Sequence, residues 1–184
     1  MELDPTRMCA LLVGLPGVFI VAVEAGLTGP IRVHVETTTT TAFCAGCGSR
    51  AWSKDRPMVE LVDLACFGRP ARLVWRKRRW RCPHAWCRIG SWTEDAPRIA
   101  PPRLAMTDRA GRWVTAQVGR CARSVNEVAV ELGCDWHTIN DAVIAYGTAL
   151  VDDPDRIGEV TALGLDEVLF ARLGRWRTQH WSTQ

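Results

Sequence analysis

Four cysteines in two close pairs constrain the fold of this chain more than any other feature. Cys44 and Cys47 lie in CAGCG, Cys82 and Cys87 lie in CPHAWC, and 34 residues separate the two pairs. Both cysteines of a CxxC pair can reach one metal ion, and the adjoining glycines permit the tight turn that surrounds a thiolate. Two strands in the interval can bring the pairs together around a tetrahedral ion. We therefore expect a closed, structural zinc site with ligands Cys44, Cys47, Cys82 and Cys87.

Disulfide bonds are the alternative use of cysteine, and the N-terminus argues against it. The first residues, MELDPTR, lack the basic start of a signal peptide. The apolar segment Leu11–Val23 is too short to span a bilayer and is interrupted by glycine and proline, so we expect a buried strand, a turn and a second strand there. A cytoplasmic, reducing location then favours metal binding. His84 is an alternative ligand to one cysteine, and Cys9, Cys66, Cys121 and Cys134 are expected to be buried thiols.

Positive charge is concentrated in the middle of the chain. Residues 44–103 carry thirteen basic and five acidic side chains, whereas residues 1–43 and 104–184 are each slightly acidic. Seven of the basic residues fall within positions 69–81, interleaved with Trp75 and Trp80. We expect the arginines to contact phosphates and the two tryptophans to lie in the core rather than stack on bases.

The first hundred residues have the pattern of a β-rich domain. Residues 18–23 and 31–37 are expected to form a hairpin around Gly26, Gly29 and Pro30. A short strand around Val59–Leu64 and a long strand over Arg72–Arg81 follow. Three prolines between residues 96 and 102 predict a linker.

After the linker the periodicity becomes helical. A helix is expected over Thr107–Cys121, and Ser124 with Glu127 forms a capping box that opens a helix ending at Gly133. Asp135 can cap a further helix, Trp136–Tyr146. The last two helices fit a helix-turn-helix, in which Asn140 can read adenine, although the second helix has no Lys or Arg. An ordinary αα-hairpin is the alternative.

Together these segments resemble the ISL-three family of insertion-sequence transposases. The resemblance rests on VETTTTTAFCAGCGSRA, VDLACFGRPARLVWRKRRWRCP, ARSVNEVAVELGCDWHTINDAV and ALGLDEVLF. It implies a zinc finger, a helix-turn-helix that binds terminal inverted repeats, and an RNase H-like domain with an Asp-Asp-Glu triad. Asp166 would be the first catalytic acid. In the complete enzyme the triad holds two Mg²⁺ ions for attack on phosphate.

The resemblance also predicts a catalytic domain that is incomplete in this sequence. The chain ends at Gln184, apparently in the second strand of that fold, before the other two acids. One carboxylate cannot assemble a two-metal site, so we expect no nuclease or strand-transfer activity.

The expected fold class is therefore α+β. It comprises a β-rich zinc-binding domain over residues 1–100, a helix-turn-helix domain over 103–150, and an incomplete RNase H-like strand pair over 160–184. Residues expected to contact DNA are Arg72, Arg76, Lys77, Arg78, Arg79, Arg81, Arg123, Trp136, His137, Thr138 and Asn140.

The expected function is recognition of element ends in double-stranded DNA by a cytoplasmic, nucleoid-associated protein, with no membrane and no small-molecule substrate. An intact transposase subunit is a second candidate partner. The alternatives are a zinc-dependent protein-interaction module, whose apolar hairpin Val160–Leu173 pairs with such a subunit, and a zinc-dependent regulator.

Overall fold

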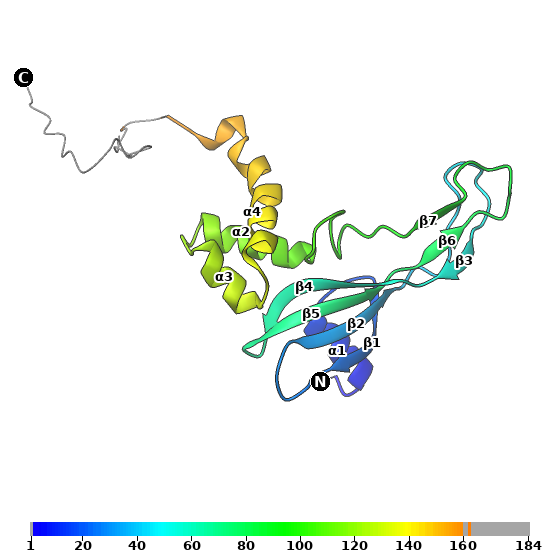
Figure 1. Ribbon diagram of the computed structural model, residues 1–184, viewed down its shortest axis with the longest axis horizontal. Coiled ribbons are helices and arrows are strands. Elements are labelled where there is room, and N and C mark those ends of the chain that lie inside the picture. The colour runs from blue at the N-terminus through cyan, green and yellow to red at the C-terminus, as the bar shows by residue number, and fades with distance from the viewer. Residues whose placement is uncertain (1, 160–161, 163–184) are drawn as a thin grey trace, which may run out of the picture. The chain divides into compact units, whose positions relative to one another are not determined.

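The computed structural model describes residues 2–159 and 162 of the chain (Figure 1). Residues up to Asp152 form one compact unit, and the described part of a second unit holds a short 3₁₀ turn, Pro154–Arg156. Within the described residues the fold is mixed α+β, with four α-helices and two sheets, which confirms the expected class. Asp166 and the hairpin predicted over Val160–Leu173 lie outside the described residues, apart from Ala162. No helix in the described part is long and apolar enough to cross a membrane.

The larger sheet has four strands in the order β1-β2-β5-β4. The antiparallel pair β1 (Val18–Glu24) and β2 (Ile31–Thr37) confirms the expected hairpin. β5 (Arg69–Arg76) pairs with β2 in parallel and with β4 (Met58–Cys66) in antiparallel. Val35, Leu73 and Trp75 are almost fully buried at its centre. Ile99 and Ala100 pack into the same core, so the proline-rich segment is part of the fold rather than a free linker.

The expectation of a buried strand, turn and strand over Leu11–Val23 is right for the second strand, which is β1, but wrong for the first strand and for the burial. The chain instead begins with a helix, α1 (Pro5–Val13), capped by the Asp4 side chain and ended by Gly14 in the left-handed conformation. Proline suits the first turn of a helix and glycine suits its end, so both signals were present in the sequence. β1 is an edge strand, and Phe19 and Val21 are exposed on it.

The smaller sheet consists of β3 (Trp52–Asp55), β6 (Arg79–Arg81) and β7 (Ser91–Thr93), in the order β3-β6-β7. The single long strand expected over Arg72–Arg81 is thus two strands in two sheets. The chain turns at Lys77 and Arg78, where the Arg78 N–H donates to Glu94 Oε1 at 2.7 Å and the Lys77 N–H donates to the Pro57 carbonyl at 2.9 Å. These two contacts lie between the end of β5 in the larger sheet and the beginning of β6 in the smaller one.

Three helices follow: α2 (Asp108–Gly119), α3 (Val125–Leu132) and α4 (Trp136–Val151). The capping box of Ser124 and Glu127, the Gly133 stop and the Asp135 cap are all confirmed. α4 continues past the expected end at Tyr146, because Gly147 lies inside the helix and does not end it. We call α2, α3 and α4 the helical unit.

The helical unit shares its core with the larger sheet. Val62 of β4 is buried in the same cluster as Met106, Val114 and the other inward-facing residues of the helices. Arg109 binds the buried Asp63 carboxylate through its Nε at 2.8 Å. Residues on both sides of the predicted boundary at 100–103 therefore stabilise each other.

Candidate metal centre and nucleic-acid interface

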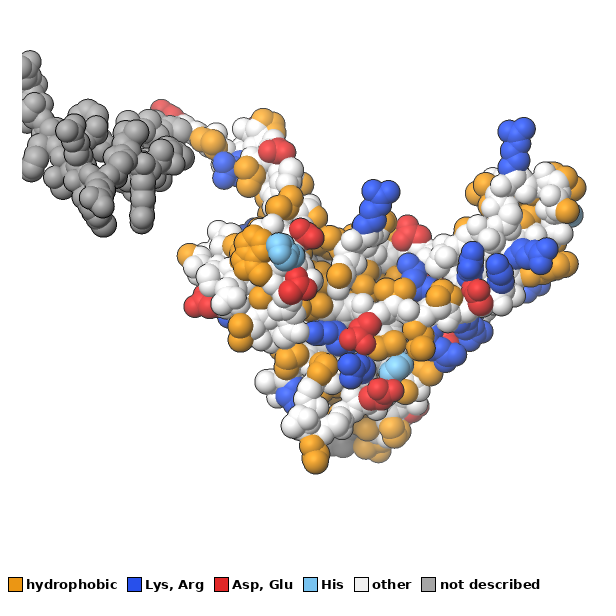
Figure 2. Space-filling view, in the orientation of Figure 1, with side chains coloured by type: hydrophobic (Ala, Val, Ile, Leu, Met, Phe, Trp, Pro, Cys, Tyr) orange, Lys and Arg blue, Asp and Glu red, His pale blue; other side chains and the backbone are white. Residues whose placement is uncertain are grey.

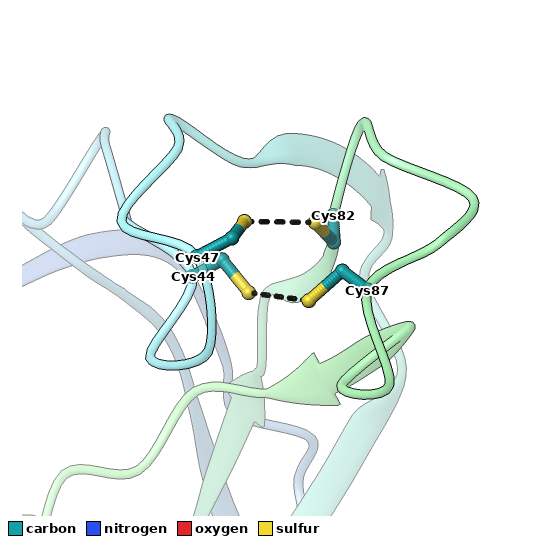
Figure 3. A group of neighbouring side chains, drawn as sticks. All are labelled: Cys44, Cys47, Cys82 and Cys87. Atoms are coloured by element: carbon teal, nitrogen blue, oxygen red, sulfur yellow. Dashed lines mark hydrogen bonds between the residues drawn. The ribbon is translucent and has the colours of Figure 1, made fainter.

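The four predicted zinc ligands converge at one end of the smaller sheet. The Sγ atoms of Cys44, Cys47, Cys82 and Cys87 all lie within 4.8 Å of one another. Cys44 faces Cys87 and Cys47 faces Cys82, each at 3.5 Å between sulfurs (Figure 3). A tetrahedral ion with Zn–S bonds near 2.3 Å requires sulfurs about 3.8 Å apart, whereas a disulfide requires about 2.0 Å. The four thiols therefore have the spacing of a metal site, and they can hold one ion such as zinc.

The backbone of the two cysteine loops explains this convergence. In the first loop the Gly48 N–H donates to the Cys44 carbonyl at 2.8 Å, and Gly48 has the positive φ of 71° that this turn needs. In the second loop the Cys82 N–H donates to the Gly90 carbonyl at 2.8 Å. Gly46 fits closely against the second loop, because an added Cβ would lie 3.3 Å from Cys87 Sγ and 2.8 Å from Ile89. The two loops are therefore shaped to face each other.

Backbone N–H groups surround the sulfurs as they do in thiolate sites. Hydrogen bonds from the backbone and side chain of Ser49 lower the pKa of Cys47 to about 6. Burial raises the pKa of Cys82 to about 12, against the effect of a backbone hydrogen bond from His84. Cys47 therefore ionises readily, whereas Cys82 needs a positive partner to lose its proton. A bound cation supplies that partner and gathers four thiolates.

His84 and the other four cysteines are not part of this cluster. His84 Nε2 is hydrogen-bonded to Ser49 Oγ at 2.9 Å, and its ring stacks on Trp86. Cys121 is exposed rather than buried as expected, and Cys9, Cys66 and Cys134 are half-buried. Within the described residues, the only group of metal-ligating side chains is the predicted set of four cysteines.

Two arginines predicted to contact DNA point into the protein. Arg72 donates to the carbonyls of Leu132 and Gly133, the first at 3.0 Å, and so caps the C-terminal end of α3. Arg78 is buried and donates to Glu36 Oε2 and to the Thr37 carbonyl, both at 3.3 Å. Arg78 is buried and the Arg72 side chain is only 12% exposed, so both guanidinium groups are engaged inside the protein rather than offered to a phosphate.

A single buried carboxylate, that of Glu36, contacts three arginines, two of which belong to the arginine-rich segment. Glu36, only 8% exposed, binds Arg78 and also pairs with Arg56 at 2.9 Å and with Arg76 at 3.1 Å. Arg79 lies 3.7 Å from Asp55. Trp75 and Trp80 are buried, as expected from the sequence. The arginine-rich segment therefore joins the two sheets as well as offering charge to solvent.

Four exposed cations without a carboxylate partner lie around the cysteines. These four cations are Arg50, Lys54, Arg81 and Arg88. All four are exposed, and none forms an ion pair within the described residues. Further exposed cations of this kind lie elsewhere in the described residues: Arg98, Arg103, Arg120 and Arg156. Figure 2 shows Lys and Arg side chains standing out over β3, β6 and β7. Only Arg81 was among the residues predicted to contact DNA. The signal for the other three was their position beside the cysteine pairs, outside the arginine run.

The α3–α4 face carries the opposite charge. Residues 124–152 include five acidic side chains and no Lys or Arg. Trp136 is 45% exposed and His137 is exposed, whereas Thr138 and Asn140 are half-buried, and the Thr138 N–H and hydroxyl both bind Asp135. Arg123 is paired with Glu131 at 2.6 Å. The predicted recognition helix thus meets solvent with an acidic surface.

Comparisons with known proteins do not assign the chain to a family. No family model, curated protein or solved structure matches it. The function must therefore be argued from the metal centre and from the distribution of charge around it.

Proposed function

We propose that this chain is a zinc-dependent DNA-binding protein that acts as the end-recognition part of an insertion-sequence transposase. The observation that carries the proposal is the four-cysteine centre surrounded by exposed cations that have no carboxylate partner within the described residues. The transposase assignment is supported by the resemblance of its ordered sequence motifs to the ISL-three family. The same resemblance would make Asp166 one of the acids that hold Mg²⁺ in enzymes of that family.

Zinc suits the site because four thiolates in tetrahedral arrangement, with no open position, favour a closed structural ion. We call β3, β6, β7 and the two cysteine loops, residues 43–55 and 79–93, the cysteine module. Its apolar cluster consists of little more than the cysteines and Trp92. So small a core needs the free energy of metal binding to stay folded.

DNA fits the charge of the cysteine module. Its residues include five basic side chains and one acidic one. Phosphate contacts are the main source of sequence-independent affinity for DNA, and a protein gains them from exposed, unpaired Lys and Arg. We therefore assign the phosphate contacts to Arg50, Lys54, Arg81 and Arg88, and we leave out Arg72 and Arg78 because both bind internal protein groups.

Fluorescence anisotropy with a duplex of about 20 base pairs tests the proposal. The zinc-loaded chain should bind with an affinity that falls steeply between about 50 and 200 mM salt. Combined Arg50→Ala, Arg81→Ala and Arg88→Ala should reduce the salt slope by about 0.9 for each lost phosphate contact. The matched control replaces Arg7, Arg32 and Arg112, three exposed arginines that already pair with carboxylates. No salt-sensitive binding of this duplex by the zinc-loaded chain would exclude recognition of double-stranded element ends.

A second candidate, a protein-interaction module, is favoured by the helical unit. Val130, Ile144 and Leu150 are exposed on helices that carry acidic side chains and no Lys or Arg after Arg123. Apolar side chains with acidic neighbours fit a basic protein partner, such as another transposase subunit, better than they fit DNA. Ile144→Ser with Val130→Ser should abolish that association and leave DNA affinity unchanged.

A further inference from the structure

We infer that the cysteine module carries a stacking site for unpaired DNA bases, formed by Phe43, Arg50, Trp52 and Arg81. We call these four residues the Phe43–Trp52 face. The inference rests on the proposed DNA-binding function and narrows its substrate to DNA in which bases are single-stranded or splayed apart. It is carried by the strand register and by the exposure of the aromatic rings.

The register places the four residues on one side of the module. Phe43 is paired with Arg50 in an antiparallel bridge, and Trp52 is paired with Arg81 across β3 and β6. Directly opposed residues share a face of a sheet, and residues two apart along a strand also share it. Arg50 and Trp52 are two apart, so both pairs lie on the same face. The alternate residues Cys44, Ala51 and Trp80 are buried on the other side.

The aromatic rings of Phe43 and Trp52 are exposed, although burying them would stabilise the module. Phe43 is 64% exposed and Trp52 is 61% exposed, in a module that buries Trp80 almost completely. A small zinc module gains stability from every aromatic ring that it buries. Trp86 is also 73% exposed in this module and stacks on His84. Phe43 and Trp52 differ from it because each has an unpaired arginine directly across from it, an arrangement suited to nucleic-acid bases and phosphates.

The spacing of the rings favours unpaired bases over a duplex. Two residues along a strand span about 6.6 Å, which separates one aromatic-arginine pair from the next. Bases in a duplex are stacked about 3.4 Å apart along each strand and offer no free ring face except at the ends. An unpaired strand can place one base on each ring while its phosphates contact Arg50 and Arg81.

The charge of the face agrees with this substrate. Five basic residues and one acidic residue in the cysteine module give a net charge of +4. Four thiolates around a divalent ion contribute about −2, which leaves about +2 for a polyanion. Ser91 lies across from Arg81 on the same face and supplies a hydroxyl beside it.

The test compares three DNA probes on the zinc-loaded full chain: a single strand of about 12 nucleotides, a blunt duplex of the same length, and that duplex with a single-stranded tail. The single strand and the tailed duplex should bind more tightly than the blunt duplex, and binding should quench tryptophan fluorescence. Trp52→Ala should weaken single-strand binding about 5- to 100-fold, and Trp52→Phe should restore most of it. Binding of the blunt duplex should change less than about twofold.

The matched control is Phe19→Ala, which removes an exposed aromatic side chain from β1, outside the cysteine module, and should leave single-strand affinity unchanged. Zinc content of one ion per chain shows that each variant is folded. Equal affinity for blunt and single-stranded probes, or an equal effect of Trp52→Ala on both, overturns the inference and leaves the proposed DNA-binding function standing. Tighter binding of the corresponding RNA strand overturns the assignment to DNA. Absence of binding to every probe overturns the proposed function itself.

Discussion

The cysteine module and the helical unit differ in what stabilises them: a cluster of four cysteines in the first and a buried apolar core in the second. The module has a sparse apolar cluster and four sulfurs that can hold one ion, and four of its five cations have no carboxylate partner within the described residues. The helical unit buries Met106, Val114, Leu132 and Ile139 completely and shares that core with β4. A metal-held module can leave its surface to a ligand, because its fold does not depend on covering every apolar side chain. The helical unit instead uses its arginines internally or in ion pairs.

Metal removal should have the largest effect, because it should unfold the cysteine module and leave the helical unit folded. Chelation, or Cys44→Ser with Cys82→Ser, should unfold the cysteine module, because structural zinc contributes on the order of 10 kcal/mol or more in small zinc-binding peptides. The helical circular dichroism should persist, since no member of the cysteine cluster belongs to the helical core. Cys121→Ser, at an exposed cysteine outside the cluster, is the control and should keep full zinc content. Loss of the helices together with the metal would contradict the separation.

The next largest effect should be on the free energy of unfolding when the Glu36 carboxylate is removed. Glu36→Gln should lower the free energy of unfolding by about 3–5 kcal/mol, because it leaves the buried Arg78 guanidinium without its counter-charge. Glu60→Gln removes an exposed carboxylate that also pairs with arginines, and it should cost less than about 1 kcal/mol. Urea denaturation of both variants measures the difference. Similar values would show that the buried cluster contributes no more than a surface pair.

A smaller effect should come from the close crossing of α2 and α4. A Cβ at Gly111 would lie 2.3 Å from the ring of Tyr146, so Gly111→Ala should destabilise the helical unit by about 1–3 kcal/mol. Gly119, in the same helix, has open space around it, and Gly119→Ala should be neutral or slightly stabilising. In thermal melts, Gly111→Ala should lower the melting temperature, and Gly119→Ala should leave it unchanged or raise it slightly. Neither change should alter zinc content or DNA affinity.

The smallest expected effect is a dependence of the helical unit on pH. Hydrogen bonds from Ser124 lower the pKa of Glu127, and hydrogen bonds from Thr138 lower the pKa of Asp135. A carboxyl group with a lowered pKa in the folded state stabilises the fold above its unfolded pKa, and that stability is lost as the pH falls. The melting temperature of the helices should therefore decrease below about pH 4.5. Ser124→Ala should reduce this dependence, and an unchanged pH profile would show that the capping box does not contribute it.

Local signals in the sequence predicted the three helices of the helical unit and the cluster of four cysteines, but not α1. Ser124, Glu127, Gly133 and Asp135 act through neighbours within a few residues, so their roles could be inferred without knowledge of tertiary contacts. The four cysteines were recognisable because metal ligation requires a particular residue type at a particular spacing.

The roles of the arginines could not be predicted in this way. Arg72 meets α3 from 60 residues away in the sequence, and Arg78 meets Glu36 from 42 residues away. Nothing in RLVWRKRRWR distinguishes the cation that caps a helix from the cation that faces solvent. The division of that segment into β5 and β6 likewise depends on Pro57 and Glu94, which are distant in the sequence. The catalytic part of the hypothesis, at Asp166, lies outside the described residues and stays a prediction.

The contacts of Glu36 have a consequence for how this protein can change over evolutionary time. Its carboxylate binds three guanidinium groups, and two of them, on Arg56 and Arg76, are partly open to solvent. A substitution that removes the carboxylate weakens the native state and at the same moment increases the non-specific attraction of the protein for polyanions. Selection against poor folding and selection against non-specific adhesion to nucleic acid therefore both preserve this carboxylate, and only an accompanying loss of arginine can relieve both.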